Sequence, residues 1–103
     1  MGVPMSPVPK PTRVRDEAWL GVIRRMPCCV CVHLNQVQHS VTEPNHTITK
    51  GSGGGDDSAA PMCHRHHRVW HHIGADTFAA VYGIDPRAVA IMLWAARCPE
   101  PFI

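Results

Sequence analysis

Two pairs of metal-ligand residues constrain this chain more than any other feature of its sequence. The first pair is Cys28 and Cys31, and the second is Cys63 and His66. A CxxC pair on a tight turn supplies half of a tetrahedral zinc site, and a CxxH pair can supply the other half. A redox dithiol is the alternative for the first pair, but no βαβ pattern surrounds it. The spacing therefore predicts a structural Zn²⁺ ion that fastens the first half of the chain to the second.

The cysteine count argues against a disulfide framework. The chain has 5 cysteines, an odd number. Cys29 is expected to pack as a small apolar group, and Cys98 is expected to stay free. The N-terminus lacks the apolar core of a signal peptide, and no run of about 18 apolar residues is present to span a membrane. We therefore expect a reduced, cytoplasmic protein whose cysteines bind metal.

The length of 103 residues allows one small domain. A core of this size is modest, and a structural metal commonly supplements it. Residues 1–12 are rich in proline and poor in large apolar side chains, which is typical of an extended tail. We expect this tail, a single domain at 13–98 and a C-terminal tail at 99–103. The formal net charge of +2 excludes a strongly basic nucleic-acid binder but allows local basic patches.

Helical periodicity is expected on both sides of the gap between the ligand pairs. Residues 14–26 space apolar side chains by three and four positions, and Pro27 ends the pattern. A second helix is expected to begin at Pro61, because proline suits a first helical turn. That helix would place ligand side chains on one side and cations on the other: Cys63, His66, His67 and His71 against Arg65, Arg68 and His72.

Two further helices are expected near the C-terminus. Asp76 or Thr77 can cap a helix that runs to Tyr82 and stops at Gly83. Asp85 and Pro86 begin a last helix, over about 88–97. Its apolar side chains are expected in the core: Val89, Met92, Leu93 and Ala96.

The stretch between the ligand pairs predicts short strands and a glycine-rich loop. Residues 36–42 alternate in polarity, with Val37, His39 and Val41 on one face, which is typical of a strand. Residues 47–49 are a second β-like piece, residues 50–57 are expected to form a flexible loop, and residues 59–60 a very short returning strand. Together with the helices, these elements predict a small α+β domain.

The order of these motifs resembles that of the HNH endonucleases, in particular the compact phage and prophage nucleases of the Ref-like type. The resemblance covers about residues 26–82. It rests on Pro27-Cys28…Cys31, on His46-Thr47-Ile48-Thr49-Lys50-Gly51-Ser52-Gly53-Gly54-Gly55-Asp56-Asp57, and on Pro61-Met62-Cys63-His64-Arg65-His66-His67 with His71-His72-Ile73-Gly74. It implies a ββα-metal (His-Me finger) core with a CxxC…CxxH zinc knuckle, flanked by an N-terminal helix and C-terminal helices.

The resemblance also implies an activity, the metal-dependent hydrolysis of DNA phosphodiester bonds. His46 matches the general base that activates water, a role that suits a neutral imidazole near pH 7. His67 and His71 match the ligands of a catalytic Mg²⁺, Mn²⁺ or Zn²⁺ ion, which stabilises the phosphate and the 3′ leaving group. Asp57, or its neighbour Asp56, is expected to orient His46 or to reach that metal.

Further expectations concern the partners. Lys50, Arg65 and Arg68 are candidate phosphate contacts, which give affinity without sequence readout. The expected partners are DNA and a phage or host protein of recombination or packaging. We expect the protein to act in the bacterial cytoplasm and to bind no membrane.

Several alternatives remain open. His39, which also precedes the glycine-rich loop, is the rival base. Many HNH proteins carry His or Asp directly before the base, where this chain has Asn45, and no Asn stands near Ser58. These departures motivate a second function, a non-catalytic zinc module that binds DNA or a recombination protein. A His-rich metal buffer is a third.

Overall fold

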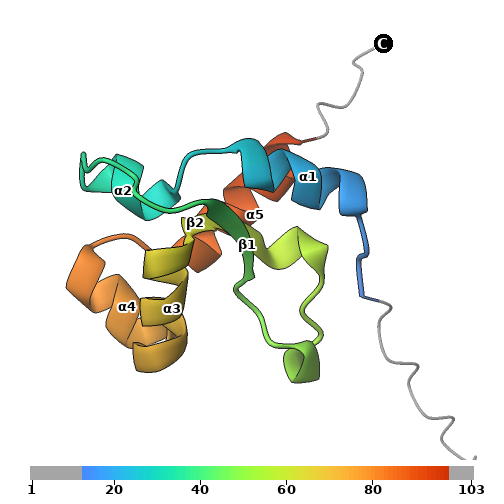
Figure 1. The fold of residues 1–103 in the computed structure, drawn as a ribbon. Coiled ribbons are helices and arrows are strands. Elements are labelled where there is room, and N and C mark those ends of the chain that lie inside the picture. The colour runs from blue at the N-terminus through green and yellow to red at the C-terminus, as the bar shows by residue number, and fades with distance from the viewer. Residues whose placement is uncertain (1–12, 98–103) are drawn as a thin grey trace, which may run out of the picture.

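The computed structural model describes residues 13–97, which form five α-helices around a two-stranded antiparallel sheet (Figure 1). The helices are α1 (Glu17–Arg25), α2 (Cys29–His33), α3 (His64–Ile73), α4 (Ala75–Tyr82) and α5 (Pro86–Ala96). The strands are β1 (Thr42–His46) and β2 (Ala59–Cys63), and two 3₁₀ turns, η1 (Lys50–Ser52) and η2 (Asp56–Ser58), lie between them. The predicted α+β class is confirmed. The predicted tails and Cys98 lie outside the described residues.

Helix α1 confirms the helix expected from apolar spacing. Asp16 caps it, because its side chain accepts a hydrogen bond from the Trp19 N–H at 2.9 Å. Trp19, Leu20 and Ile23 point inward and are buried. Trp19 packs edge-on against Trp94 of α5, with ring centroids 5.9 Å apart. This contact joins the N-terminal and C-terminal helices.

The strand expected at residues 36–42 is wrong. Residues 36–41 form a loop, with the Val37 and Val41 side chains exposed, and only Thr42 belongs to a strand. The Gln38 side chain holds the loop: it accepts from the Cys28 N–H at 2.7 Å and donates to the Ser40 carbonyl at 2.7 Å. Residues 47–49 are also loop. The actual first strand, Thr42–His46, contains Pro44, which lowers its strand propensity and hid it from sequence reasoning.

The helix expected to begin at Pro61 begins instead at His64, because Pro61 belongs to β2. In the sheet Pro61 lies opposite Pro44. A backbone hydrogen bond lies at each end of the ladder. One runs from the His64 N–H to the Val41 carbonyl, and the other from the Thr47 N–H to the Ser58 carbonyl. Between them, hydrogen-bonded and non-hydrogen-bonded residue pairs alternate, as in any antiparallel ladder. By that alternation the two prolines meet where no N–H is needed. The short strand expected at 59–60 thus extends to Cys63.

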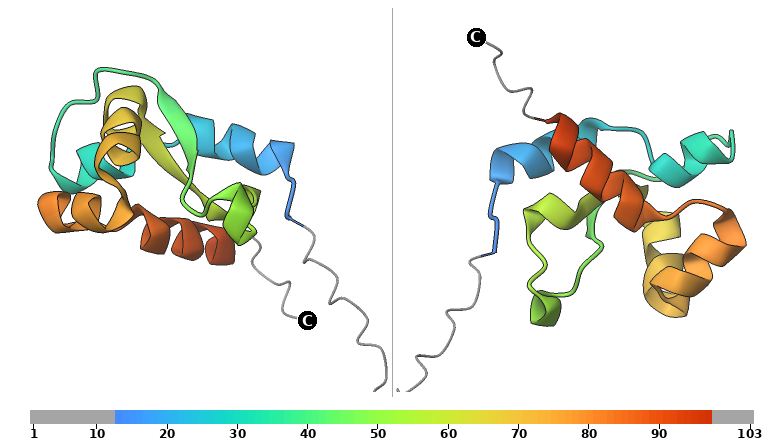
Figure 2. Two further views of the ribbon diagram at one scale, coloured as in Figure 1. Left: turned by 90° about the horizontal axis from the view of Figure 1, so that it is seen from below. Right: turned by 180° about the vertical axis from the view of Figure 1, so that it is seen from behind.

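Strand β2 connects two small cores. All five of its residues are buried. Ala59 packs with α1 and α5, whereas Met62 and Cys63 pack with Trp70 of α3 and Phe78 of α4. Helix α5 packs against β2 and η2, on the side that faces the viewer in the right-hand view of Figure 2. Strand β2 therefore packs with α1 and α5 at its beginning and with α3 and α4 at its end.

The C-terminal helices are present, with two corrections. The residue before α4 is Gly74, and no side chain caps that helix, so the expected cap by Asp76 or Thr77 is wrong. The cap by Asp85 and the stop at Gly83 (φ 70°) are confirmed. In α5 the buried residues are Pro86 and Ala90, while Met92, expected in the core, is 62% exposed, and Ala96 is exposed as well. Among the described residues, no single helix is long and apolar enough to cross a membrane, although α4 and α5 together reach that length with a 93° bend.

The glycine-rich loop is shaped by two close backbone approaches. A Cβ atom on Gly54 would lie 1.9 Å from the Ile48 carbonyl oxygen, and one on Gly55 would lie 2.6 Å from the Val14 carbonyl oxygen. A Cβ atom on Gly51 would meet no atom within 4 Å. Gly54 and Gly55 are therefore structural requirements, while Gly51 is not.

Replacing Gly54 by alanine should lower the free energy of unfolding by about 1–3 kcal/mol, because the added methyl group forces the loop away from Ile48. Gly51→Ala is the matched control and should change it by less than about 1 kcal/mol. Chemical denaturation at a constant free zinc concentration measures both. Equal stability of the two variants would show that the loop does not need this close approach.

Candidate metal centre and neighbouring histidine site

The structure brings the four predicted zinc ligands together in one buried cluster. Cys28 and Cys31 come from the start of α2, Cys63 ends β2, and His66 lies in the first turn of α3. Their ligand atoms all lie within 4.8 Å of one another. The four cysteines of the described range are all free thiols. A Cys₃His cluster of this kind can hold a metal ion such as zinc.

The distances in this cluster match a tetrahedral zinc site. Metal–ligand bonds of about 2.3 Å to sulfur and 2.0–2.1 Å to nitrogen place two sulfur atoms about 3.8 Å apart, and sulfur and nitrogen about 3.6 Å apart. The Cys31 and Cys63 Sγ atoms are 3.9 Å apart. The His66 Nδ1 atom lies 3.6, 3.5 and 3.2 Å from the sulfur atoms of Cys28, Cys31 and Cys63. The donor set therefore fits one tetrahedral ion.

Burial also shifts the protonation of two of the ligands. Burial, together with the neighbouring Cys28, raises the pKa of Cys31 to about 12, because closely spaced sulfur atoms resist ionising together. Burial lowers the pKa of His66, which keeps its ring neutral, as metal ligation requires. Cys29, predicted to be a spare residue, packs half-buried against the same core.

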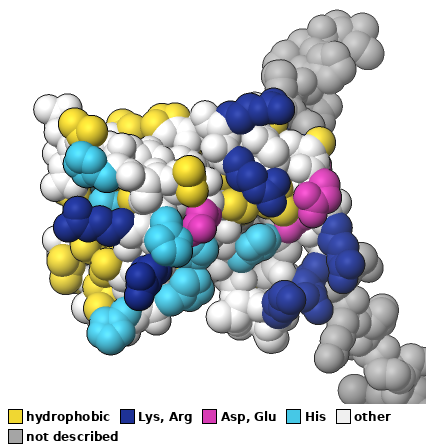
Figure 3. Space-filling model, viewed as in Figure 1, with side chains coloured by type: hydrophobic (Ala, Val, Ile, Leu, Met, Phe, Trp, Pro, Cys, Tyr) yellow, Lys and Arg dark blue, Asp and Glu magenta, His cyan; other side chains and the backbone are white. Residues whose placement is uncertain are grey.

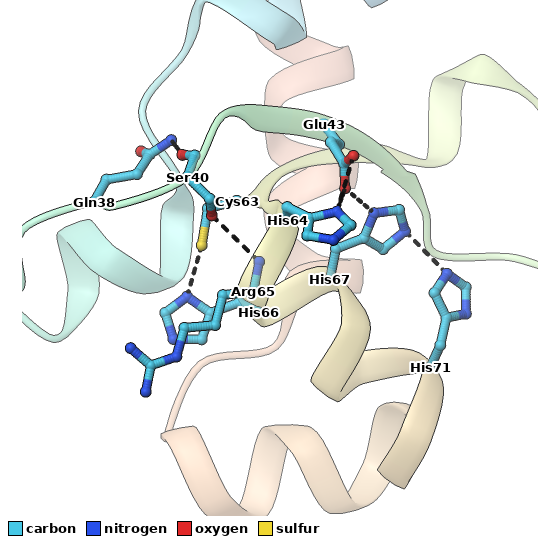
Figure 4. A network of polar contacts seen from close by, with 9 residues as sticks. All are labelled: Gln38, Ser40, Glu43, Cys63, His64, Arg65, His66, His67 and His71. Atoms are coloured by element: carbon cyan, nitrogen blue, oxygen red, sulfur yellow. Dashed lines mark hydrogen bonds and ion pairs between the residues drawn. The ribbon is translucent and has the colours of Figure 1, made fainter.

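A second group of side chains forms on the exposed side of α3. His67 and His71, one turn apart, approach through their Nε2 atoms at 2.9 Å. The His67 Nδ1 atom lies 3.0 Å from the Glu43 carboxylate of β1, and Glu43 also contacts His64 Nδ1 at 3.2 Å (Figure 4). The hydrogen bond from His67, followed by that from His64, lowers the pKa of Glu43. An ionised Glu43 thus accepts hydrogen bonds from both rings.

This arrangement selects the His67 tautomer. When His67 Nδ1–H donates to Glu43, the His67 Nε2 atom carries a lone pair, and the His71 Nε2–H donates to it. A divalent cation can replace that proton. Two imidazole nitrogens bound to one octahedral ion at about 2.1 Å lie about 3.0 Å apart, whereas a tetrahedral zinc ion places them about 3.4 Å apart. The observed separation of 2.9 Å is close to the octahedral value.

His46 forms a second pair with a carboxylate. It ends β1, and its Nε2 atom lies 2.8 Å from Asp56 Oδ1. The other oxygen of Asp56 accepts from the Asp16 N–H at 2.6 Å. Although partial burial acts in the opposite direction, the Asp16 N–H and the His46 ring lower the pKa of Asp56. Asp56, the alternative to Asp57, is thus the carboxylate on His46.

Strand alternation separates His46 from its neighbour Asn45. Asn45 is 0% exposed and donates to the Met62 sulfur at 3.0 Å, whereas 42% of the His46 side chain is exposed. His39, the rival base, is exposed and lies along a different depression, with Arg65, His66 and Tyr82.

Two open clefts meet at His71. We call the first the loop cleft; it has a volume of 600 Å³ and contains His46, Asp56, Lys50 and His71 along its walls. We call the second the helix cleft; it has a volume of 750 Å³ and lies along the exposed side of α3. Its walls are formed by His64, Arg65, Arg68, Val69, His71 and His72. His46 and His71 therefore open onto the same space.

One expectation about α3 needs correction. The sequence pattern predicts that Arg65, Arg68 and His72 face away from both metal sites, and this prediction is wrong for the second site. They line the helix cleft together with His71. The reason is that Arg68 and His71 are three positions apart and are therefore neighbours on the surface of α3. Lys50 lies in the loop cleft instead.

Sequence reasoning missed several residues of this site. Glu43 lies in a strand that the sequence pattern does not reveal, because Pro44 beside it masks the strand propensity. Arg13 and Arg15 line the loop cleft although they precede His46 by more than thirty positions. The uneven distribution of basic residues toward the N-terminus is the available signal for these two arginines.

Comparisons with known proteins found no matching family model, no matching curated protein and no matching solved structure.

The metal cluster should hold one zinc ion per chain, and Cys31→Ser should lose both the ion and the folded state, because a structural zinc ion contributes directly to folding. Cys29→Ser is the matched control, which should retain the zinc and the fold. Elemental analysis and thermal melting by circular dichroism, with and without a chelator, measure these effects. Full zinc content in Cys31→Ser would contradict the proposed ligand set.

Glu43→Ala should weaken binding of a second divalent ion about 10- to 100-fold, because the residue that orients His67 is removed. Glu43→Gln keeps an acceptor for the His67 N–H and should weaken binding less. Calorimetric titration of the zinc-loaded protein with Co²⁺, which lies between Fe²⁺ and Ni²⁺ in the affinity order for such sites, measures the affinity, and the zinc content should not change. Unaltered Co²⁺ affinity in Glu43→Ala would remove Glu43 from this role.

Proposed function

We propose that this chain is a metal-dependent endonuclease of the HNH type that hydrolyses DNA phosphodiester bonds. One observation carries the proposal. The His46–Asp56 pair shares the loop cleft with His71, which is bonded to His67; the first pair is suited to move a proton and the two histidines of α3 to hold a cation. Hydrolysis of a phosphodiester requires both of these functions close together.

His46 is the proposed general base. Because its Nε2 atom is engaged by Asp56, its Nδ1 atom is left to accept a proton from water. Asp56 is held on its other oxygen by the Asp16 N–H, so it orients the His46 ring in the manner of the third member of a catalytic triad. The partial exposure of His46 leaves room for water and substrate.

His67 and His71 are the proposed ligands of the catalytic ion. A Mg²⁺, Mn²⁺ or Zn²⁺ ion held there would stabilise the charge on the phosphate and on the 3′ leaving oxygen. Glu43 keeps the His67 ring in the required tautomer. Lys50, Arg65 and Arg68 line the two clefts and would contact phosphates of a bound strand.

The local architecture supports the same proposal. Strand β1, the glycine-rich loop, β2 and α3 follow one another directly, which is the ββα order expected of an HNH unit. The Cys₃His cluster joins the end of β2 and the start of α3 to α2. Its role is structural, since all four of its residues are buried. By the same resemblance, the protein would act within phage or prophage DNA recombination or packaging in the bacterial cytoplasm.

A second function is favoured by Asn45. In the HNH pattern the residue before the base often provides another metal ligand, but Asn45 is fully buried and bonded to Met62. The second ion would therefore have only two protein ligands besides solvent. A module that binds DNA through its cationic clefts, without cleaving it, needs only the zinc cluster.

Plasmid nicking distinguishes the two functions. The zinc-loaded protein with added Mg²⁺, Mn²⁺ or Zn²⁺ should nick supercoiled DNA, and His46→Ala should reduce the rate about 10²- to 10⁴-fold, the usual contribution of a general base. His39→Ala is the matched control, which should keep the full rate. A reduction in His39→Ala instead would assign the base to His39. DNA binding without nicking by any of the three ions would favour the binding module.

A further inference from the structure

The two clefts adjoin at His71 on the face that carries the histidines, and we refer to them together as the depression. His71 belongs to both, with the helix cleft on one side and the loop cleft on the other. Figure 3 shows this face, with His side chains across its middle and Lys and Arg side chains on both sides. The cations of the helix cleft are Arg65 and Arg68, and those of the loop cleft are Arg13, Arg15 and Lys50.

The charge of this depression is positive on both sides of His71. The helix cleft has no carboxylate among its lining residues in the described part of the chain. The loop cleft has two, Glu17 and Asp56. The three cations of the loop cleft, Arg13, Arg15 and Lys50, still outnumber these two carboxylates, so the loop cleft has a net positive charge.

The segment that carries Arg13 and Arg15 is anchored at the candidate site. The Asp56 N–H donates to the Val14 carbonyl at 2.8 Å, and the Asp16 N–H donates to the Asp56 carboxylate at 2.6 Å. The absence of a side chain at Gly55 permits this contact, because a Cβ atom there would lie 2.7 Å from the Val14 nitrogen. Arg15 is close enough for its charge to act on Asp56. These two arginines are thus positioned by the same residue that orients His46.

We propose that residues 13–15 are one arm of a phosphate-binding track whose other arm is the exposed side of α3. One polynucleotide backbone would contact Arg13 and Arg15 on the His46 side and Arg65 and Arg68 on the opposite side of His71. The choice of a polynucleotide as the ligand rests on the proposed function. The lining residues described for the two clefts include no Phe, Tyr or Trp. Without these large aromatic platforms for base stacking, the arginines of the track are assigned to phosphates rather than to bases.

Binding of DNA tests this without cleavage. Fluorescence anisotropy of a labelled mixed-sequence duplex is measured over a range of KCl concentrations, with zinc-loaded protein and no added catalytic ion. Removing one cation that binds a phosphate lowers the salt slope by about 1. Arg13→Gln/Arg15→Gln and Arg65→Gln/Arg68→Gln should each lower it by about 2. The quadruple variant should lower it by about 4, because one duplex occupies both arms at once.

The matched control removes the same charge from another surface. Arg24→Gln/Arg25→Gln alters two exposed arginines at the end of α1 that line neither cleft, and it should leave the slope unchanged. An equal reduction in this control would overturn the track, because binding would then follow net charge alone. A quadruple variant no weaker than either double variant would also overturn it, because the arms would not act on one strand.

The outcome is separable from that of the proposed endonuclease. Slopes that follow the two arms in a protein that never nicks DNA would support the track and refute the enzyme. Nicking that depends on His46 while the arm variants bind like the parent protein would support the enzyme and refute the track.

Discussion

The meeting of Cys28, Cys31, Cys63 and His66 is the constraint on which the rest of this structure depends. Its ligands come from three elements: the start of α2, the end of β2 and the first turn of α3. A chain of this size has two small cores rather than one large one. The cluster lies in the core that contains Trp70 and Phe78, so a bound ion would add stability where the hydrophobic contribution is limited.

The same cluster determines which way α3 presents its histidines. His66 and His67 are consecutive, and consecutive side chains on a helix point about 100° apart. With His66 held among the cysteines, His67 is directed toward Glu43 of β1, and His71 follows one turn later. Structural and proposed catalytic ligands therefore occupy adjacent positions without competing. The buried His66 thus sets the rotation of α3 about its axis.

Sequence reasoning succeeded where residue chemistry alone decides the outcome. The CxxC and CxxH spacings were sufficient for the metal cluster, and helix-end chemistry was sufficient for the stop at Gly83 and the cap by Asp85. It failed where a proline had two possible meanings. Pro61 suits a first helical turn, and only its pairing with Pro44 places it in a strand. Glu43 escaped notice for the same reason, since its role depends on a strand register that no local pattern reveals. Arg13 and Arg15 reach the site only through the fold.

The two hydrogen bonds of Asp56 link the order of the histidine site to that of helix α1. Its two carboxylate oxygens are attached to different parts of the molecule, one to the backbone of the residue that caps α1 and the other to the His46 ring. The carboxylate therefore connects the first helix to the end of β1. If the first turn of α1 frays, the hydrogen bond from the Asp16 N–H is lost, and the His46 imidazole loses its fixed orientation. The outermost turn of the domain and the centre of its histidine site would then lose their order as one unit, although they lie thirty residues apart in the chain.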